Sequence, residues 1–355
     1  MKTLKSVIKW VVAIALICAA LVFLASINGL KVSRTVLSVG ENNVTEAEFK
    51  YYLENVKLEM LSDAKVDTTD EKAVKDFWKS DIDGEKASEV AKEKALDDVI
   101  FTETAVAKAK EAKVSLSDTE LANIKAYLTP EVVDGMKDSI GADKATLEKI
   151  LEKEALVNAY KEHLSKATDS PIAPATEKIE EKVEKDYAQV KHILVLSQPE
   201  QPTDEEGKEI DTEKYKKDAK AKADEVLKKA LAGEDFDALV KEYGEDPGMT
   251  NSPDGYIIDK DGYGIDGQSQ MVPEFTEGTF KVAAGEINAE LVESSYGWHI
   301  IKRVSIDKEA ETYSTVLQSA TNALSADMFE EYVNGLKKDT KYTVKENVLK
   351  SINVK

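Results

Sequence analysis

The chain has 355 residues, of which 42% are apolar and 33% charged, with 17 glycines, 8 prolines and a single cysteine. This composition excludes collagen-like, disulfide-scaffold and wholly disordered proteins, and the length is enough for two or three globular units. The formal net charge is −20, and so acidic a protein would repel the phosphates of nucleic acids. We therefore expect no nucleic-acid partner.

The first thirty residues differ from the rest of the chain. Trp10–Ala25 is an unbroken apolar run, and Ser26 and Ile27 extend it to about the length that spans a bilayer. The basic residues of this segment all precede the run, at Lys2, Lys5 and Lys9. By the positive-inside rule the N-terminus stays in the cytoplasm and the body lies across the membrane. We predict a membrane anchor or export signal at residues 1–30.

Two features bear on how this segment is processed. Phe23 stands where a signal peptidase site prefers a small residue, although Ala25 is small, so we favour an uncleaved anchor. Cys18 raises the alternative of a lipoprotein, but Ile17 occupies a position where lipoprotein signals carry a small residue. No cysteine follows, which suits an oxidising compartment without thiol or metal chemistry.

Helical patterns dominate residues 45–166. Before them, Thr35–Val39 alternates like a short strand and Gly40–Asn43 has turn composition, while Thr45 followed by Glu48 has the spacing of a capping box. The segment is predicted to form strand, turn and helix.

An apolar stripe from Ala91 to Ala109, spaced by three and four residues, predicts one long helix. Ser115, Ser117 and Asp118 offer the cap of the next one, and further helices are expected at Thr119–Leu128 and Lys144–Leu164. His163 lies near a helix end among Lys and Glu, and we expect it to face solvent.

The composition changes between Ala167 and Thr176, where two prolines favour an extended linker. We place a domain boundary there. The charge-dense stretch Glu177–Asp186 is interpreted as a solvated helix that connects two domains.

The pattern after the linker is that of a small α+β unit. It begins with a compact apolar strand at Val190–Leu196, and the polar residues 200–212 are expected to form an exposed loop. Gly and Pro residues from Gly244 to Gly267 predict a long irregular loop with short strands. The other expected elements are helices at Lys214–Ala232 and from Asp235 to Tyr243, a short helix with turns at Met271–Phe280, a turn into a strand at Gly285–Ile287 and a closing strand at Trp298–Val304.

Residues 186–305 resemble a parvulin-type peptidyl-prolyl isomerase domain. The segments that carry the resemblance occur in the family's order: His192-Ile193-Leu194-Val195 in the opening strand, Gly233-Glu234-Asp235-Phe236 at a helix junction, Met271 through Phe275, Gly285-Glu286-Ile287 at a turn, and Gly297-Trp298-His299-Ile300-Ile301 in the closing strand.

The flanking regions resemble PrsA-type and SurA-like export chaperones. Val36–Phe49 and Ala95–Asp118 are similar to the N-terminal part of these proteins. Ser325–Lys341 is an amphipathic helix pattern, and Tyr342–Ile352 reads as a strand and a terminal turn, which in that family return beside the N-terminal segment.

The resemblance implies an α+β fold in which a mostly helical, discontinuous chaperone domain carries an inserted parvulin-like α+β isomerase domain. One N-terminal transmembrane helix precedes them. The domains are assigned to residues 1–30 (anchor or signal), 31–175 and 306–355 (chaperone domain) and 186–305 (isomerase domain). Whether the helical arms form a homodimer is left open.

The chemistry that the resemblance implies is rotation about X–Pro peptide bonds. A peptide bond has a rotation barrier of about 18–20 kcal/mol, and for X–Pro the cis and trans forms differ by only about 1 kcal/mol. A catalyst must bind the twisted amide better than the planar one, in a water-poor seat for the proline ring. No nucleophile, metal or cofactor is expected.

The family's roles fall on five residues of this chain. His192 and His299 are implied to be paired imidazoles at the floor of the site, and Asp246 to set the polar network around them. Met271 and Phe275 are implied to line the pocket for the proline ring. Because a carboxylate stands at 246, where some parvulins carry cysteine, a covalent thiolate mechanism is not expected.

Each of these residues also has a structural interpretation. The two histidines can serve mainly to hold the fold through fixed tautomers. Asp246 precedes Pro247 and can be a turn former. Met271 and Phe275 can be ordinary core residues.

One segment departs from the family pattern. Parvulins typically carry Gly-Gly-Asp-Leu-Gly before the Met segment, whereas here the nearest stretch is Ser252-Pro253-Asp254-Gly255-Tyr256. The pocket leucine is missing, and Tyr256 and Ile257 are candidates for its place. The rate of catalysis is therefore open.

Two function classes follow. In the first, the protein is a membrane-tethered, extracytoplasmic foldase that isomerises X–Pro bonds in unfolded exported polypeptides and binds them as a chaperone. In the second, it is a non-catalytic holdase with a degenerate parvulin domain. A third interpretation is a helical surface protein without a client.

Overall fold

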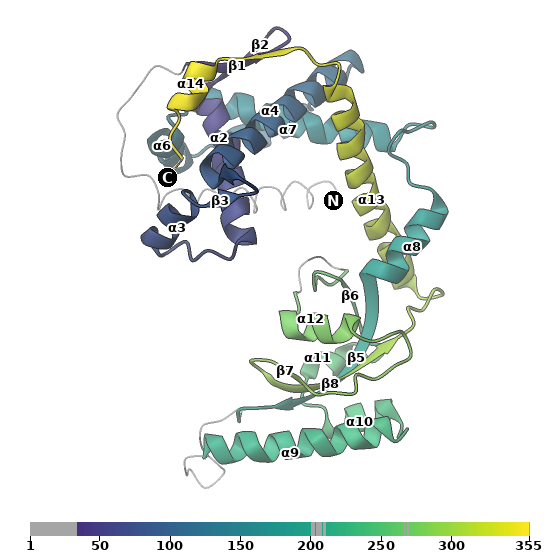
Figure 1. The fold of residues 1–355 in the computed structure, drawn as a ribbon. Coiled ribbons are helices and arrows are strands. Elements are labelled where there is room, and N and C mark those ends of the chain that lie inside the picture. Colours follow the sequence, from purple (N-terminus) through teal and green to yellow (C-terminus); the bar gives the residue numbers. More distant parts are fainter. Residues whose placement is uncertain are drawn as a thin grey trace. The chain divides into compact units, whose positions relative to one another are not determined.

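The computed structural model describes residues 34–199, 203, 208, 211–265, 267 and 270–354 (Figure 1). They divide into two compact units: unit 1 holds the residues before Pro174 together with those from Ala326 onward, and unit 2 is Pro174–Ser325. The mixed helical and sheet fold expected from the sequence is confirmed. The predicted anchor at 1–30 lies outside the described residues, and none of the helices within them is both long and apolar enough to cross a membrane.

Unit 1 is mainly helical. Its core forms where α2 packs against α4 and α7, with Phe49, Val99 and Ile150 among the fully buried side chains. The predicted apolar stripe from Ala91 to Ala109 is buried along α4. The helices up to the unit boundary are α2 (Glu46–Asp63), α3 (Glu71–Phe77), α4 (Ala87–Glu111), α5 (Asp118–Tyr127), α6 (Pro130–Ile140) and α7 (Lys144–Ser165).

A three-stranded antiparallel sheet joins the two ends of the described chain in unit 1. The strands β1 (Thr35–Val39), β2 (Asn42–Thr45) and β9 (Tyr342–Val344) pair in the order β2-β1-β9. The final helix, α14 (Glu346–Ser351), packs beside β1 (Figure 1). The predicted turn after β1 is shorter than expected, because β2 already begins at Asn42. A separate two-stranded hairpin, β3 (Asp81–Ile82) and β4 (Glu85–Lys86), precedes α4.

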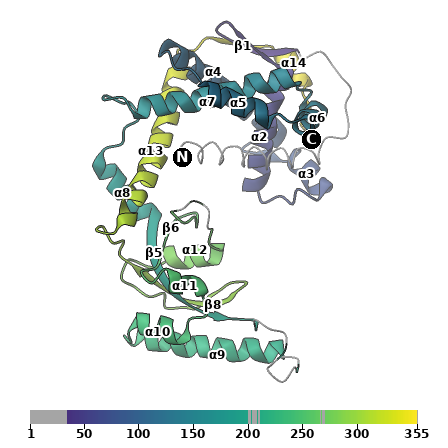
Figure 2. The same ribbon diagram turned by 180° about the vertical axis from the view of Figure 1, so that it is seen from behind.

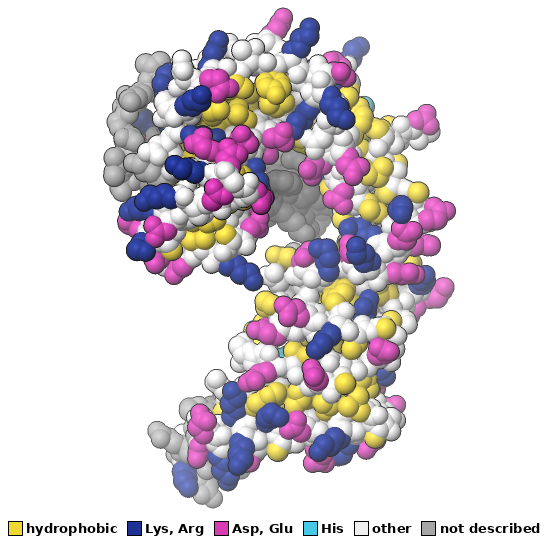
Figure 3. All heavy atoms as spheres, in the orientation of Figure 1, with side chains coloured by type: hydrophobic (Ala, Val, Ile, Leu, Met, Phe, Trp, Pro, Cys, Tyr) yellow, Lys and Arg dark blue, Asp and Glu magenta, His cyan; other side chains and the backbone are white. Residues whose placement is uncertain are grey.

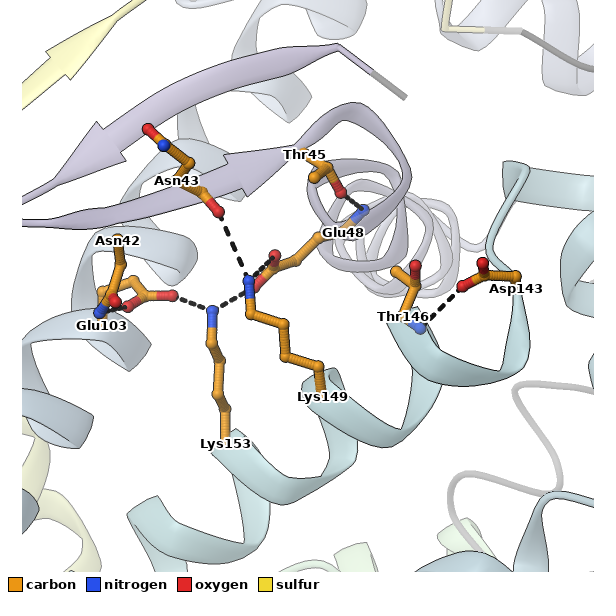
Figure 4. A network of polar contacts seen from close by, with 9 residues as sticks. All are labelled: Asn42, Asn43, Thr45, Glu48, Glu103, Asp143, Thr146, Lys149 and Lys153. Atoms are coloured by element: carbon orange, nitrogen blue, oxygen red, sulfur yellow. Dashed lines mark hydrogen bonds and ion pairs between the residues drawn. The ribbon is translucent and has the colours of Figure 1, made fainter. Parts of the chain in front are cut away.

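The predicted capping box at Thr45 is only half formed. Thr45 accepts a hydrogen bond from the Glu48 backbone N–H at 3.3 Å, but the Glu48 carboxylate is buried and pairs with Lys153 of α7 (Figure 4). Lys153 also pairs with the buried Glu103 of α4, which accepts a hydrogen bond from Asn42 at 2.8 Å. Two buried carboxylates thus share Lys153 between α2, α4 and α7, and Glu48 also pairs with Lys149 of α7 at 3.3 Å.

Unit 2 is a four-stranded antiparallel sheet covered by helices on both faces. The strands β5 (Tyr187–Leu196), β6 (Tyr256–Asp259), β7 (Val292–Glu293) and β8 (Gly297–Val304) pair in the order β6-β5-β8-β7. Its helices are α8 (Thr176–Asp186), α9 (Thr212–Leu231), α10 (Phe236–Tyr243), α11 (Pro247–Asn251) and α12 (Pro273–Phe280). Both α9 and α10 cover one face of β5 and β8, and α12 lies on the other (Figures 1 and 2).

The alternation of side chains in the two central strands decides which of them reach each face. Ile193, Val195 and Trp298 pack toward α9 and α10. Val190 and Ile301 pack on the opposite face with the α12 side chains. His192 and His299, which have the same parity as Val190 and Ile301, are therefore on the α12 face.

The C-terminal helix begins earlier than the sequence predicted. The helix expected at Ser325–Lys341 is α13 (Glu311–Lys337). Val316 and Ala320 of its first half are fully buried against Val183 and Tyr187, and unit 2 accordingly extends beyond residue 305. Acidic and basic side chains are interspersed over the face drawn in Figure 3, as expected of a chain with 33% charged residues.

Candidate functional site

The structure brings the two predicted histidines together in unit 2. In the β5–β8 ladder His192 lies opposite Ile301 and His299 opposite Leu194, so the two histidines are diagonal neighbours on one face. Their Nδ1 atoms are 3.2 Å apart and their ring centroids 5.3 Å. Each residue is only 4% exposed.

Asp246 lies beside this pair. It is the N-cap of α11, a position that aspartate favours, with Pro247 as the first helical residue. Its Oδ1 accepts a hydrogen bond from the Gly248 N–H at 3.0 Å. Its Oδ2 lies 2.8 Å from His192 Nε2 and accepts a second hydrogen bond from the Tyr256 hydroxyl at 2.7 Å.

These contacts keep Asp246 ionised. Burial by itself would raise the pKa of this carboxyl, but the hydrogen bonds from His192, Tyr256 and Gly248 outweigh it and hold the pKa well below its usual range. Burial and the neighbouring carboxylate raise the pKa of the Tyr256 phenol. The phenol therefore stays protonated and donates to Asp246.

The hydrogen bonds run in one direction through both imidazoles. An ionised carboxylate only accepts hydrogen bonds, so His192 donates from Nε2, and the network then assigns His299 Nδ1 as the donor to His192 Nδ1. That leaves His299 Nε2 to accept from the Ser294 hydroxyl, 2.7 Å away. The hydrogen bonds thus run from Ser294 to His299, from His299 to His192 and from His192 to Asp246. Ser294 was missed in the sequence, where nothing distinguishes it from other serines near a turn.

His299 is a neutral imidazole at neutral pH. Burial, followed by the electrostatic effect of the adjacent His192 imidazole, lowers its pKa to about 3. A neutral ring is consistent with the donor direction above, since Nε2 must offer a lone pair to Ser294.

Phe275 of α12 supplies the apolar side of the site. Its ring packs edge-on against both imidazoles, with centroid distances of 4.9 Å to His192 and 5.4 Å to His299. Met271 is partly buried in the same apolar cluster, together with Val292 of β7. All five residues assigned by the resemblance are thus placed on the α12 face of the sheet or at its edge.

The structure also distinguishes the two candidates for the missing leucine. Tyr256 belongs to the apolar cluster of the site, and its ring centroid is 5.8 Å from that of His192. Ile257 points the other way and packs with Val183 and Tyr187. His163 is exposed on α7 of unit 1, as expected. In the described part of the chain, no group of three or more His, Cys, Asp or Glu side chains is arranged to hold a metal ion.

Comparison with known proteins gives the family. The family model of the PPIC-type PPIase domain matches residues 176–308. The chain is 26% identical over 310 residues to the foldase protein PrsA of Caldanaerobacter subterraneus subsp. tengcongensis, covering 85% of both chains. It is 30% identical over 257 residues to the foldase protein PrsA of Bacillus subtilis, covering 71% of this chain and 75% of the relative.

Among solved structures, the peptidylprolyl isomerase PrsA from Bacillus cereus is similar, with 20% identity, coverage of 91% of this chain and 93% of that chain, and a TM-score of 0.28. The chain belongs to the PrsA foldase family, and its central unit contains a PPIC-type peptidyl-prolyl isomerase domain.

Proposed function

We propose that this protein is an extracytoplasmic foldase that catalyses cis–trans isomerisation of X–Pro bonds in exported polypeptides and binds these polypeptides as a chaperone. The observation that carries the proposal is the one-directional chain of hydrogen bonds through His299 and His192 to Asp246, with the Phe275 ring packed on both imidazoles. Membership of the foldase family supports the same activity.

The catalysed step needs no bond to be made or broken. In the planar amide, resonance places a partial double bond between carbon and nitrogen, and rotation must remove it. A water-poor site disfavours the planar, more charge-separated form relative to the twisted one. Phe275 and Met271 form the apolar seat for the proline ring and exclude water from it.

The polar groups of the site act without rearranging. Ser294, His299 and His192 each have a fixed hydrogen-bond direction because the carboxylate at the end of the chain only accepts. Groups that are already oriented stabilise a twisted carbonyl or nitrogen at no cost in reorganisation. Asp246 is the fixed negative end of this series of hydrogen bonds and does not act as a nucleophile.

The proposed location follows from the N-terminal segment. The apolar run at residues 10–27, preceded by lysines, supports a single-pass membrane anchor with a cytoplasmic N-terminus and the remaining chain outside. Protease protection of the C-terminus in intact cells, with N-terminal sequencing of the mature protein, tests both the orientation and the retention of the anchor.

Turnover is tested on the full chain with Ala-Pro and charged-residue-Pro peptides, by NMR exchange or by a protease-coupled assay. We expect catalysis in the wild type and a loss of at least about tenfold in kcat/KM for Asp246→Asn, equivalent to about 1.4 kcal/mol or more of transition-state stabilisation. His163→Gln, in unit 1, is the matched control and should be unaffected. A wild-type rate equal to the uncatalysed rate would refute the catalytic part.

In that event the holdase alternative is favoured, for which the altered segment Gly255-Tyr256 is the supporting observation. Suppression of aggregation of an unfolded, proline-containing client by the same preparation separates the holdase from a protein without clients. The holdase predicts suppression that Asp246→Asn leaves intact.

A further inference from the structure

The tyrosine that stands near the missing pocket leucine has a polar contact that a leucine cannot make. The Tyr256 hydroxyl donates to Asp246 Oδ2, the same oxygen that faces His192 Nε2. The tyrosine comes from β6, the histidine from β5 and the aspartate from the start of α11. Three segments thus meet at one carboxylate oxygen.

Gly248 provides a second, independent observation. A Cβ atom added at Gly248 would lie 2.1 Å from the Tyr256 hydroxyl oxygen and 3.2 Å from Asp246 Oδ1. No side chain other than hydrogen leaves room for the phenol in this position. The backbone N–H of the same residue holds Oδ1, so Gly248 fixes both the carboxylate and the space for its second donor.

We infer that Tyr256 is a positioning residue of the isomerase site, whose hydroxyl, seated in the space left by Gly248, holds the Asp246 carboxylate with Oδ2 turned toward His192. The catalytic consequence of this inference rests on the proposed function, whereas the positioning itself does not. Tyr256 acts on the reaction through Asp246 and the two imidazoles.

Among the residues that the structure describes, few charged or titratable groups surround the carboxylate, which makes the effect of the phenol measurable. Asp246 is faced by His192 from β5 and Tyr256 from β6, with His299 of β8 behind His192. Removal of the phenol hydroxyl leaves the carboxylate with one donor fewer on Oδ2. Its remaining hydrogen bond with His192 then strengthens, and the carboxyl becomes easier to protonate.

The test is NMR of the full chain carrying ¹⁵N-labelled histidine and ¹³C-labelled aspartate. The chain has only three histidines, and the exposed His163 serves as an internal reference. In Tyr256→Phe we expect the His192 Nε2–H signal to move downfield at neutral pH. The Asp246 carboxyl signal, assigned by its absence from Asp246→Asn, should begin to titrate about one pH unit higher, since one charge-assisted hydrogen bond is lost.

Gly248→Ala should give the same two changes, because the new methyl group displaces the phenol. In the double variant Gly248→Ala/Tyr256→Phe the changes should not add, since both substitutions remove the same contact. Tyr263→Phe is the matched control: it removes a hydroxyl from a tyrosine of unit 2 that is 44% exposed, and should leave both signals in place.

Unchanged signals in Tyr256→Phe, or full additivity in the double variant, would overturn the inference. The proposed function fails separately: a wild-type chain that does not accelerate isomerisation removes the catalytic consequence but leaves the NMR result to decide the positioning role. If the wild type is active, the acid limb of its pH–rate profile should shift upward in Tyr256→Phe, whereas a merely structural role would lower the rate at all pH values alike.

Discussion

Acidification should destabilise unit 2 through one buried histidine. The pKa of His299 is about 3 in the folded protein, because the ring is buried and lies beside His192. In the unfolded chain a histidine titrates near about 6.5. Between these two values the unfolded chain binds a proton that the folded unit does not bind, so the free energy of unfolding falls as the pH falls through this window.

The magnitude follows from the slope of this linkage. A single proton difference changes the free energy of unfolding by about 1.4 kcal/mol per pH unit. Between pH 7.5 and pH 5, the unfolded chain binds the extra proton only below about pH 6.5, that is over about 1.5 pH units. Protonation of His299 in the unfolded chain should therefore lower the free energy of unfolding of unit 2 by about 2 kcal/mol. This is a large part of the stability of a small domain.

The assay is urea unfolding at pH 5 and at pH 7.5, followed by a short hydrogen-exchange pulse at one fixed pH and mass spectrometry of peptides from β5 and β8. His299→Gln cannot take up the proton, so its loss of stability between the two pH values should be smaller than that of the wild type by about 2 kcal/mol. His163→Gln, at an exposed position, should keep the wild-type dependence. Equal pH dependences in His299→Gln and wild type would refute the reasoning.

The remaining predictions concern buried charge and packing. Lys153→Met leaves the buried Glu103 without a cation and Glu48 with only Lys149 (Figure 4), and should cost unit 1 about 3–5 kcal/mol in a urea titration. Lys149→Met, whose side chain is 48% exposed, should cost no more than about 1 kcal/mol in the same titration, and similar costs would contradict the assignment. Burial raises the pKa of Glu154 in α7 to about 7, so the free energy of unfolding of unit 1 falls as the pH rises from about 4.3 toward 7. Glu154→Gln should therefore stabilise unit 1 at pH 8 by about 1–2 kcal/mol, and no gain in stability at pH 8 would contradict this. Gly278→Ala places a methyl group 2.6 Å from a valine of β7, so it should lower the Tm of unit 2, at a cost of about 1–3 kcal/mol in the free energy of unfolding. Gly335→Ala in α13 meets nothing within 4 Å and should raise the free energy of unfolding by about 0.5–1 kcal/mol. Equal effects of the two substitutions would argue against the packing account.

The strands that carry the two histidines can be predicted from the sequence, but the register between these strands cannot. The strands at β5 and β8 follow from apolar runs bounded by turn residues, and the alternation within each strand fixes which residues share a face. Once the two strands pair antiparallel, a shift of one residue in register would send one histidine to the face covered by α9 and α10. The register itself depends on contacts between residues more than a hundred positions apart.

Some caps and helices could be predicted from residues that are close together in the sequence. The sequence offered Ser115, Ser117 and Asp118 as cap candidates, of which Ser117 is the N-cap of α5 and forms a capping box with Glu120. The apolar stripe of α4 was also visible, because it involves residues within a few turns of one another. The helix α6 was missed, although Thr129 caps it and Gly141 ends it in a left-handed conformation with φ of 77°. Its start and stop signals are equally local.

By itself the sequence determined the acidic character of the chain, the apolar N-terminal segment, the change of pattern near residue 174 and the residue types of the site. Only the tertiary structure decided which partner each polar side chain takes: Glu48 turns from its own helix end to Lys153, Ser294 reaches His299, and Tyr256 rather than Ile257 faces Asp246. The physical reason is that caps and stripes are satisfied within one element, whereas a buried hydrogen bond depends on the register and packing of several elements at once.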